Sequence, residues 1–149
     1  MIAGYEVANN TVASPGAGVA ALELRAPTRR FKIREFSVAS QAATAFRFGL
    51  GRPAAIGVTP VTQSTVQAQD PAEVAGTTIS VISWTTGPTV PGTQLRQFDF
   101  NNVPGSAVIW TWPSDGELID PIVAGAATTL VLWAITAGPT CDYYAVGGE

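Results

Sequence analysis

Two strongly β-prone runs in the last third of the chain limit the possible folds most. Residues 105–112 are Gly-Ser-Ala-Val-Ile-Trp-Thr-Trp, and residues 128–136 are Thr-Thr-Leu-Val-Leu-Trp-Ala-Ile-Thr. Branched and aromatic side chains dominate both runs, and such side chains fit a pleated sheet better than a helix. Apolar residues fall on both faces of the two-residue strand period. We therefore predict two strands that are covered on both sides, with a turn at residues 113–116 after the first.

Alternation between turn residues predicts further strands along the rest of the chain. These are residues 19–25, 30–40, 44–50, 77–84, 94–100 and 141–146, with one short strand near 61–66. Within 30–40 the apolar parity switches between Arg34 and Phe36, which predicts a β-bulge. Residues 1–10 form either an opening strand or an arm. With about eight strands and no convincing helix, we predict an all-β fold, an antiparallel β-sandwich that is jelly-roll-like.

Residues 51–76 form the one long loop of this prediction. The segment contains Pro53, Pro60 and Pro71 and shows little periodicity. A loop of this length is usually functional, so we interpret it as an interaction loop or as a plain surface excursion. The 149 residues suit a single domain, 1–149. Only 13% of the residues are charged, about half the usual share, which favours a subunit of an assembly over a free monomer.

The residue types exclude several classes of chemistry. Histidine is absent, so neither a Ser-His-Asp triad nor a Cys-His pair can form. Cys141 is the only cysteine, which rules out a disulfide within the chain. The net charge is −3 and no long basic block occurs, so nucleic-acid binding is not expected. No apolar run is long enough to cross a bilayer, and no export signal follows Met1, so we expect synthesis in the cytoplasm without export.

Two short patterns suggest chemistry but fail on their context. Residues 16–21 match G-x-G-x-x-A, with Glu35 near the distance of a ribose-binding acid, yet Pro27 ends any helix too early for a dinucleotide fold. Three acidic residues, Asp115, Glu117 and Asp120, lie within six positions. The cluster has three interpretations: calcium ligands, a carboxylate pair for glycoside hydrolysis, or acids that form a turn. We favour the turn. The sequence thus predicts no enzyme, no catalytic residue, no metal, no cofactor and no small-molecule substrate.

Aromatic residues offer one further alternative. They are Trp84, Trp110, Trp112, Trp133, Tyr143 and Tyr144. Such side chains line carbohydrate platforms, but they are also enriched in cores and subunit interfaces, which we favour here.

Four segments carry a family resemblance. They are Phe48-Gly-Leu-Gly-Arg-Pro-Ala-Ala-Ile-Gly-Val-Thr-Pro60, Ser83-Trp84 with Gly87-Pro88-Thr89, Val108-Ile-Trp-Thr-Trp-Pro113, and Leu130-Val-Leu-Trp133. Together they resemble small jelly-roll structural proteins of tailed bacteriophages. The similarity extends over about residues 31–146.

The resemblance implies a virion component on the capsid surface, a decoration (cement) or minor head protein. It also implies a homo-oligomer, most simply a trimer, that binds the major capsid protein. The competing hypothesis is a carbohydrate- or receptor-binding sandwich of a phage tail or spike. For the first hypothesis, contacts are expected from the N-terminal arm and the long loop. The residues expected there are Ile2, Tyr5, Arg52, Pro53, Ile56, Val58, Pro60 and Val61.

Overall fold

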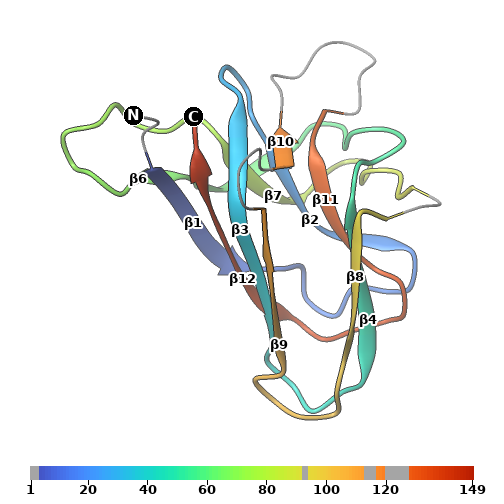
Figure 1. The fold of residues 1–149 in the computed structure, drawn as a ribbon. Helices are drawn as coiled ribbons and strands as arrows, with labels where there is room; N and C mark the ends of the chain where they lie inside the picture. Colours follow the sequence, from blue (N-terminus) through green and yellow to red (C-terminus); the bar gives the residue numbers. More distant parts are fainter. Residues whose placement is uncertain (1–3, 92–93, 113–116, 120–127) are drawn as a thin grey trace.

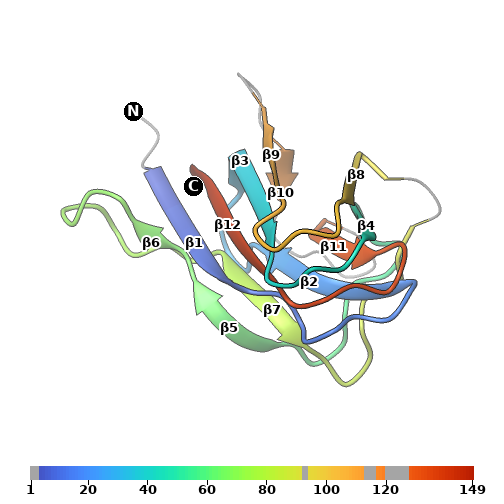
Figure 2. The same ribbon diagram turned by 90° about the horizontal axis from the view of Figure 1, so that it is seen from below.

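The protein is a sandwich of two antiparallel β-sheets. A computed structural model describes residues 4–91, 94–112, 117–119 and 128–149, which contain strands and no helix. The strands are β1 Gly4–Asn10, β2 Val19–Arg25, β3 Phe31–Ser40, β4 Phe46–Gly51, β5 Val61–Thr65, β6 Gln67–Ala68, β7 Ile79–Ser83, β8 Arg96–Phe100, β9 Ala107–Thr111, β10 Glu117–Ile119, β11 Leu130–Ala134 and β12 Cys141–Gly148. Figures 1 and 2 show the two layers.

Each sheet combines strands that are far apart in the sequence. Sheet A has the order β10-β3-β12-β1-β6, and β9 also pairs with β3. Sheet B has the order β5-β7-β2-β11-β4-β8. Because β9 and β10 pair with successive parts of β3, they share one edge of sheet A. The predicted turn at residues 113–116 lies between them, outside the described residues.

The pairing of eight strands is nested, as in a jelly roll. The first pairs with the last (β1 with β12), and the next pairs inward are β2 with β11, β3 with β9, and β4 with β8. This order is a long hairpin rolled into two sheets. The long connection between β4 and β8 holds β5, β6 and β7, which extend both sheets on one side. The predicted all-β, jelly-roll-like sandwich is therefore confirmed.

The predicted bulge in β3 is present. Val146 lies opposite Glu35, but Gly147 lies opposite Ile33, so Arg34 is the extra residue. The extra residue lets apolar side chains before and after it point into the same core, although their sequence parity differs. Gly147 is needed opposite this bulge, because a Cβ built there would lie 2.3 Å from the backbone oxygen of Lys32.

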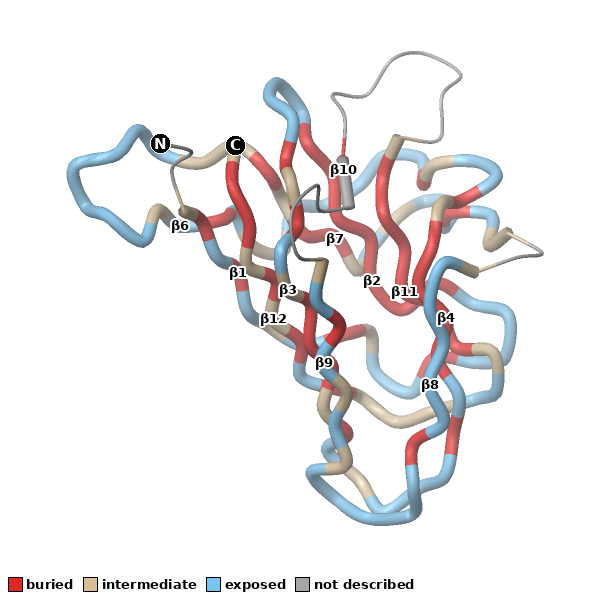
Figure 3. The backbone as a smooth tube through the Cα atoms, viewed as in Figure 1, coloured by how far each residue is buried: buried red, intermediate tan, exposed pale blue. Residues whose placement is uncertain are grey.

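The core lies between the sheets, and Figure 3 shows the buried residues along both layers. Phe46, Phe48 and Phe100 form one aromatic group, in which the rings of Phe46 and Phe100 stack with centroids 4.4 Å apart. Tyr5 is 2% exposed, because its side chain packs in the main core, and β1 itself pairs with β12 and β6. Residues 4–10 are thus a strand inside sheet A, and the interpretation as an arm is wrong for them.

The two runs that dominate the sequence have different surroundings. All residues of β11 are buried, because the strand lies between β2 and β4 and both its faces are covered, as predicted. For β9 the prediction of two covered faces is wrong. Ile109 is 57% exposed, whereas Trp110 is buried. The strand packs one face on the core and leaves the other face, on the outside of sheet A, open to solvent.

Candidate functional site

Part of the predicted interaction loop folds over the outer face of sheet B. We call segments 52–60 and 84–91 together the loop cap. The two segments form isolated bridges between Ala55 and Thr89 and between Val58 and Thr86. Backbone amides reinforce them, since Val58 N donates to Thr86 O at 2.8 Å and Thr89 N donates to Ala55 O at 2.9 Å. This part of the long loop is therefore held in a defined conformation.

An apolar layer lies under the loop cap. Val131 and Trp133 point outward from β11 and form a second small core with Ala20, Trp84 and Val90. The indole of Trp133 lies over two glycines of the neighbouring strand β4, and a Cβ added to the first of them would approach the ring to 2.8 Å. The glycines in the sequence Phe-Gly-Leu-Gly of β4 therefore make room for this ring.

Hydrogen bonds to a buried ion pair, Glu23 with Arg25, also hold the loop cap in place. Glu23 of β2 is fully buried and accepts hydrogen bonds from Arg25 Nη2 at 2.9 Å, Trp84 Nε1 at 2.7 Å and Thr129 Oγ1 at 2.9 Å. Arg25 Nη2 also donates to the carbonyl oxygen of Gly57, inside the cap. Such a network fixes its partners strongly, because any polar group that loses its partner there is left without water.

Three of the eight residues expected to contact partners are exposed. Tyr5 and Pro53 are buried, and the hydroxyl of Tyr5 donates to the carbonyl oxygen of Val74 at 2.9 Å. Arg52 and Ile56 are half-buried, and Ile2 lies outside the described residues. The exposed residues are Val58, Pro60 and Val61. They follow one another closely where the loop cap leads into β5.

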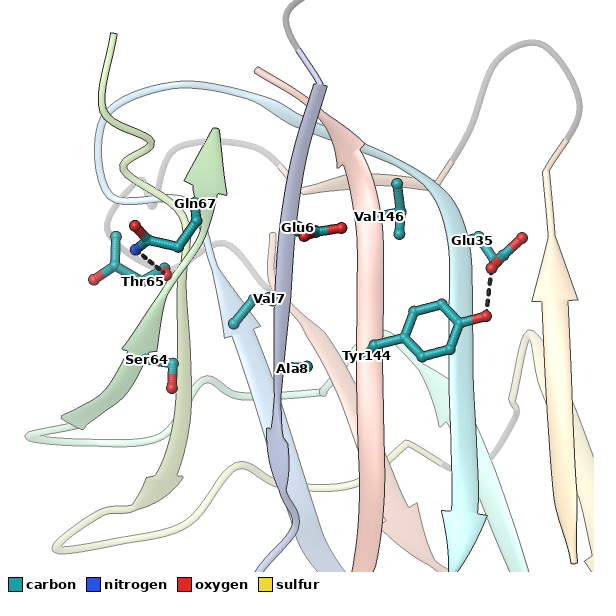
Figure 4. Close-up of a pocket in the computed structure, with 9 residues that line it drawn as sticks. All are labelled: Glu6, Val7, Ala8, Glu35, Ser64, Thr65, Gln67, Tyr144 and Val146. Carbon is teal, nitrogen blue, oxygen red and sulfur yellow. Dashed lines mark hydrogen bonds between the residues drawn. The ribbon is translucent and has the colours of Figure 1, made fainter. Parts of the chain in front are cut away.

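A groove crosses the outer face of sheet A, on the opposite side of the molecule. The strand registers place Gln67, Glu6, Val146 and Glu35 in one row across β6, β1, β12 and β3. Tyr144 lies in the next row, and its hydroxyl donates to the carboxylate of Glu35. Figure 4 shows these side chains, with Ser64 and Thr65 at one rim, around a cavity of about 680 Å³. The sequence pointed to Tyr144 only as one of six aromatic residues and did not predict the groove.

The aromatic residues split between core and groove. Trp110, Trp133 and Tyr143 are buried, so they cannot form an external platform. Trp112 is half-buried, with the guanidinium of Arg96 5.6 Å from its ring centroid. These positions agree with the favoured interpretation of most aromatics as core, and they leave Tyr144 as the aromatic side chain of the groove.

Burial keeps two titratable side chains of the core, Cys141 and Tyr143, in their neutral forms. Burial raises the pKa of the Cys141 thiol to about 12, with a further contribution from the charge of Asp142. Burial likewise raises the pKa of Tyr143 to about 12. Because the thiolate is the nucleophilic form, Cys141 is poorly suited to covalent chemistry. Among the residues that the structure describes, no group of three or more His, Cys, Asp or Glu could hold a metal ion, and no helix could span a membrane.

Comparisons with known protein families and with curated proteins gave no match, so the proposals below are argued from the geometry of the protein. The resemblance to phage structural proteins therefore stays a prediction from the sequence motifs. Of the three acidic residues noted in the sequence, Asp115 and Asp120 lie outside the described residues, and Glu117 begins β10.

Proposed function

We propose that this protein is a non-enzymatic structural component of a tailed-phage virion. It acts as a capsid decoration (cement) or minor head protein that binds copies of itself, most simply as a trimer, and the major capsid lattice. The observation that carries the proposal is the loop cap, which presents exposed apolar residues on a segment fixed by the buried Glu23 network. A contact surface that is ordered before binding loses less conformational entropy on association.

The exposed side chains where the loop cap leads into β5 give the proposed contact. Val58 is 55% exposed and Val61 is 62% exposed, with the exposed Pro60 between them. Each valine that a partner buries contributes about 1.5 kcal/mol. Losing both contributions weakens a single contact about a hundredfold. An oligomer that makes several such contacts with one head binds by avidity, so that weak single contacts suffice for stable attachment.

Two measurements test the proposal: the mass of the oligomer in solution and the binding of the protein to phage heads. Native mass spectrometry gives the oligomer, and co-sedimentation with phage heads that lack the protein gives occupancy. The double variant Val58→Asp/Val61→Asp is expected to lower occupancy at least tenfold. The matched control is Val103→Asp. This valine is 57% exposed, close to the values for Val58 and Val61, but it lies between β8 and β9, so the variant should bind like the unchanged protein. An unchanged protein that stays monomeric and ignores heads refutes the proposal, as does equal loss in both variants.

A further inference from the structure

We propose that the groove on the outer face of sheet A binds a glycan built from neutral or amino sugars. Glu6, Tyr144 and Glu35 form its centre. This site is separate from the loop cap, which lies on sheet B, and it does not depend on the proposed virion role.

The register spaces two carboxylates across the groove. Glu6 pairs with Val146, which in turn pairs with Glu35, so the three residues lie in one row on the outer face. Two strand spacings put the Cα atoms of Glu6 and Glu35 about 10 Å apart. Figure 4 shows the carboxylate of Glu6 extending over β12 toward this space. A ligand seated above Val146 would therefore meet a hydrogen-bond acceptor on both sides.

Tyr144 supplies an apolar platform beside this row. Figure 4 looks onto the outer face of sheet A. In this view the Tyr144 ring lies between β12 and β3 and turns its flat face toward the viewer. The hydrogen bond from its hydroxyl to the Glu35 carboxylate holds the ring in that position. Tyr144 is half-buried, and a flat aromatic surface that is partly open to solvent beside fixed polar groups suits a ligand with an apolar face and polar edges. A pyranose ring has this character, because its C–H groups cover the face and its hydroxyls surround the edge.

The polar lining decides the charge of the ligand. Ser64, Thr65 and Gln67 add hydroxyl and amide groups at the rim. The described residues that line the groove include two carboxylates and no lysine or arginine. Neither carboxylate has a salt bridge within the part of the chain that the structure describes. Each carboxylate already accepts one side-chain hydrogen bond, Glu35 from Tyr144 and Glu6 from Gln69 at 3.5 Å, but an ionised carboxylate can accept several. Sugar hydroxyls or an amino group can donate to the remaining acceptor positions, whereas an acidic sugar would be repelled.

Three oligosaccharide probes test the site by isothermal titration calorimetry on the full chain. Maltohexaose is neutral, a glucosamine hexamer is cationic, and a galacturonate hexamer is acidic. We expect the first two to bind, the glucosamine hexamer more tightly, and the galacturonate hexamer to show at least tenfold weaker binding than maltohexaose. Failure of both maltohexaose and the glucosamine hexamer to bind at millimolar concentration overturns the inference, as does equal binding of the acidic probe.

Variants separate the platform from simple attraction between charges. Tyr144→Ala should weaken maltohexaose binding at least tenfold, and Tyr144→Phe, which keeps the ring, should weaken it less. Ile109→Ala is the control, because this exposed residue lies on the same face of sheet A but outside the groove. Circular dichroism melts check that each variant folds. Binding of the glucosamine hexamer alone, lost in Glu6→Gln but kept in Tyr144→Ala, would identify a plain cation site and overturn the glycan assignment.

Discussion

The buried hydrogen-bond network around Glu23 predicts that removing one charge of the Glu23–Arg25 pair destabilises the protein more than removing both charges. Replacing Glu23 by alanine removes the acceptor for three side chains at once. The guanidinium of Arg25, whose side chain is 6% exposed, would keep only the carbonyl oxygen of Gly57 as a partner. Breaking a buried ion pair from one side costs about 3–5 kcal/mol, because the remaining charge stays out of water. We expect Glu23→Ala to lower the free energy of unfolding by about 4 kcal/mol.

Removing both charges should cost less than removing one. In Glu23→Leu/Arg25→Met the chains keep similar volume and no ion remains under the loop cap. Trp84 Nε1 and Thr129 Oγ1 still lose their acceptor, at about 1–3 kcal/mol for an unsatisfied buried donor. The double variant should therefore be more stable than Glu23→Ala by about 2 kcal/mol. Glu23→Leu alone keeps the volume but leaves the charge of Arg25 unpaired, so it should also be less stable than the double variant if the charge, rather than packing, sets this ordering.

Urea denaturation followed by tryptophan fluorescence measures these differences at constant m value. Amide hydrogen exchange at Val58 and Thr89 reports the loop cap itself, because both amides donate across it. In Glu23→Ala these two amides should lose protection more than amides of β12. The reasoning fails if Glu23→Ala lies within 1 kcal/mol of the unchanged protein, or if the double variant is the less stable of the two.

Three further predictions concern other parts of the fold. Gly147→Ala should destabilise the protein by about 2 kcal/mol or more in urea, since the added Cβ meets the Lys32 carbonyl; a change under about 0.5 kcal/mol contradicts this. Cys141 should resist thiol reagents at pH 8 until the chain unfolds. Because its folded pKa is raised to about 12, stability should fall as the pH rises from about 9 toward 12, less so in Cys141→Val; equal slopes in both proteins contradict this. The hydrogen bond from Arg47 lowers the pKa of Asp99, so Arg47→Gln should raise that pKa in an NMR titration, and an unchanged value would disprove the pairing.

Local sequence patterns predicted most of the strands but not which strands pair with one another, and the short strands β6 and β10 were not predicted. The strand at residues 19–25 and the parity switch before Phe36 were predicted as the structure has them. The parity switch depends on side-chain period alone, which a sequence displays directly, and the strand at 19–25 was inferred because Pro27 leaves too little room for a helix. The exposed face of β9 was not predicted, because apolar residues on both parities do not tell whether a second layer covers the strand. Ile109 shows this, as it is exposed beside the buried Trp110.

The functional surfaces were predictable only in part. The long loop was identified from its prolines and its length, and Val58 and Val61 are exposed on it. Tyr5 was misassigned, because its burial depends on pairing between β1 and strands more than 60 residues away. A signal for the network did exist in Glu23 and Arg25, two charges within an otherwise apolar strand. The groove could not be predicted, since the register of β1, β12 and β3 creates it.

The outer faces of the two sheets differ in how far the chain covers them, and this difference relates the proposed capsid contact to the proposed glycan site. Sheet B buries its outward Trp133 and Glu23 under residues of the long connection, so the chain itself covers the part of this face around β2 and β11. Sheet A keeps Glu6 and Tyr144 on an outer face that forms the groove. If the loop cap binds a capsid, the groove on the opposite sheet is directed away from that contact. Heads carrying the protein should then bind maltohexaose-coated beads far more tightly than the free chain does, because many grooves act together. A Tyr144→Ala protein should decorate heads normally yet leave them unable to bind the beads. Loss of both properties in that variant would mean that the two faces are not independent.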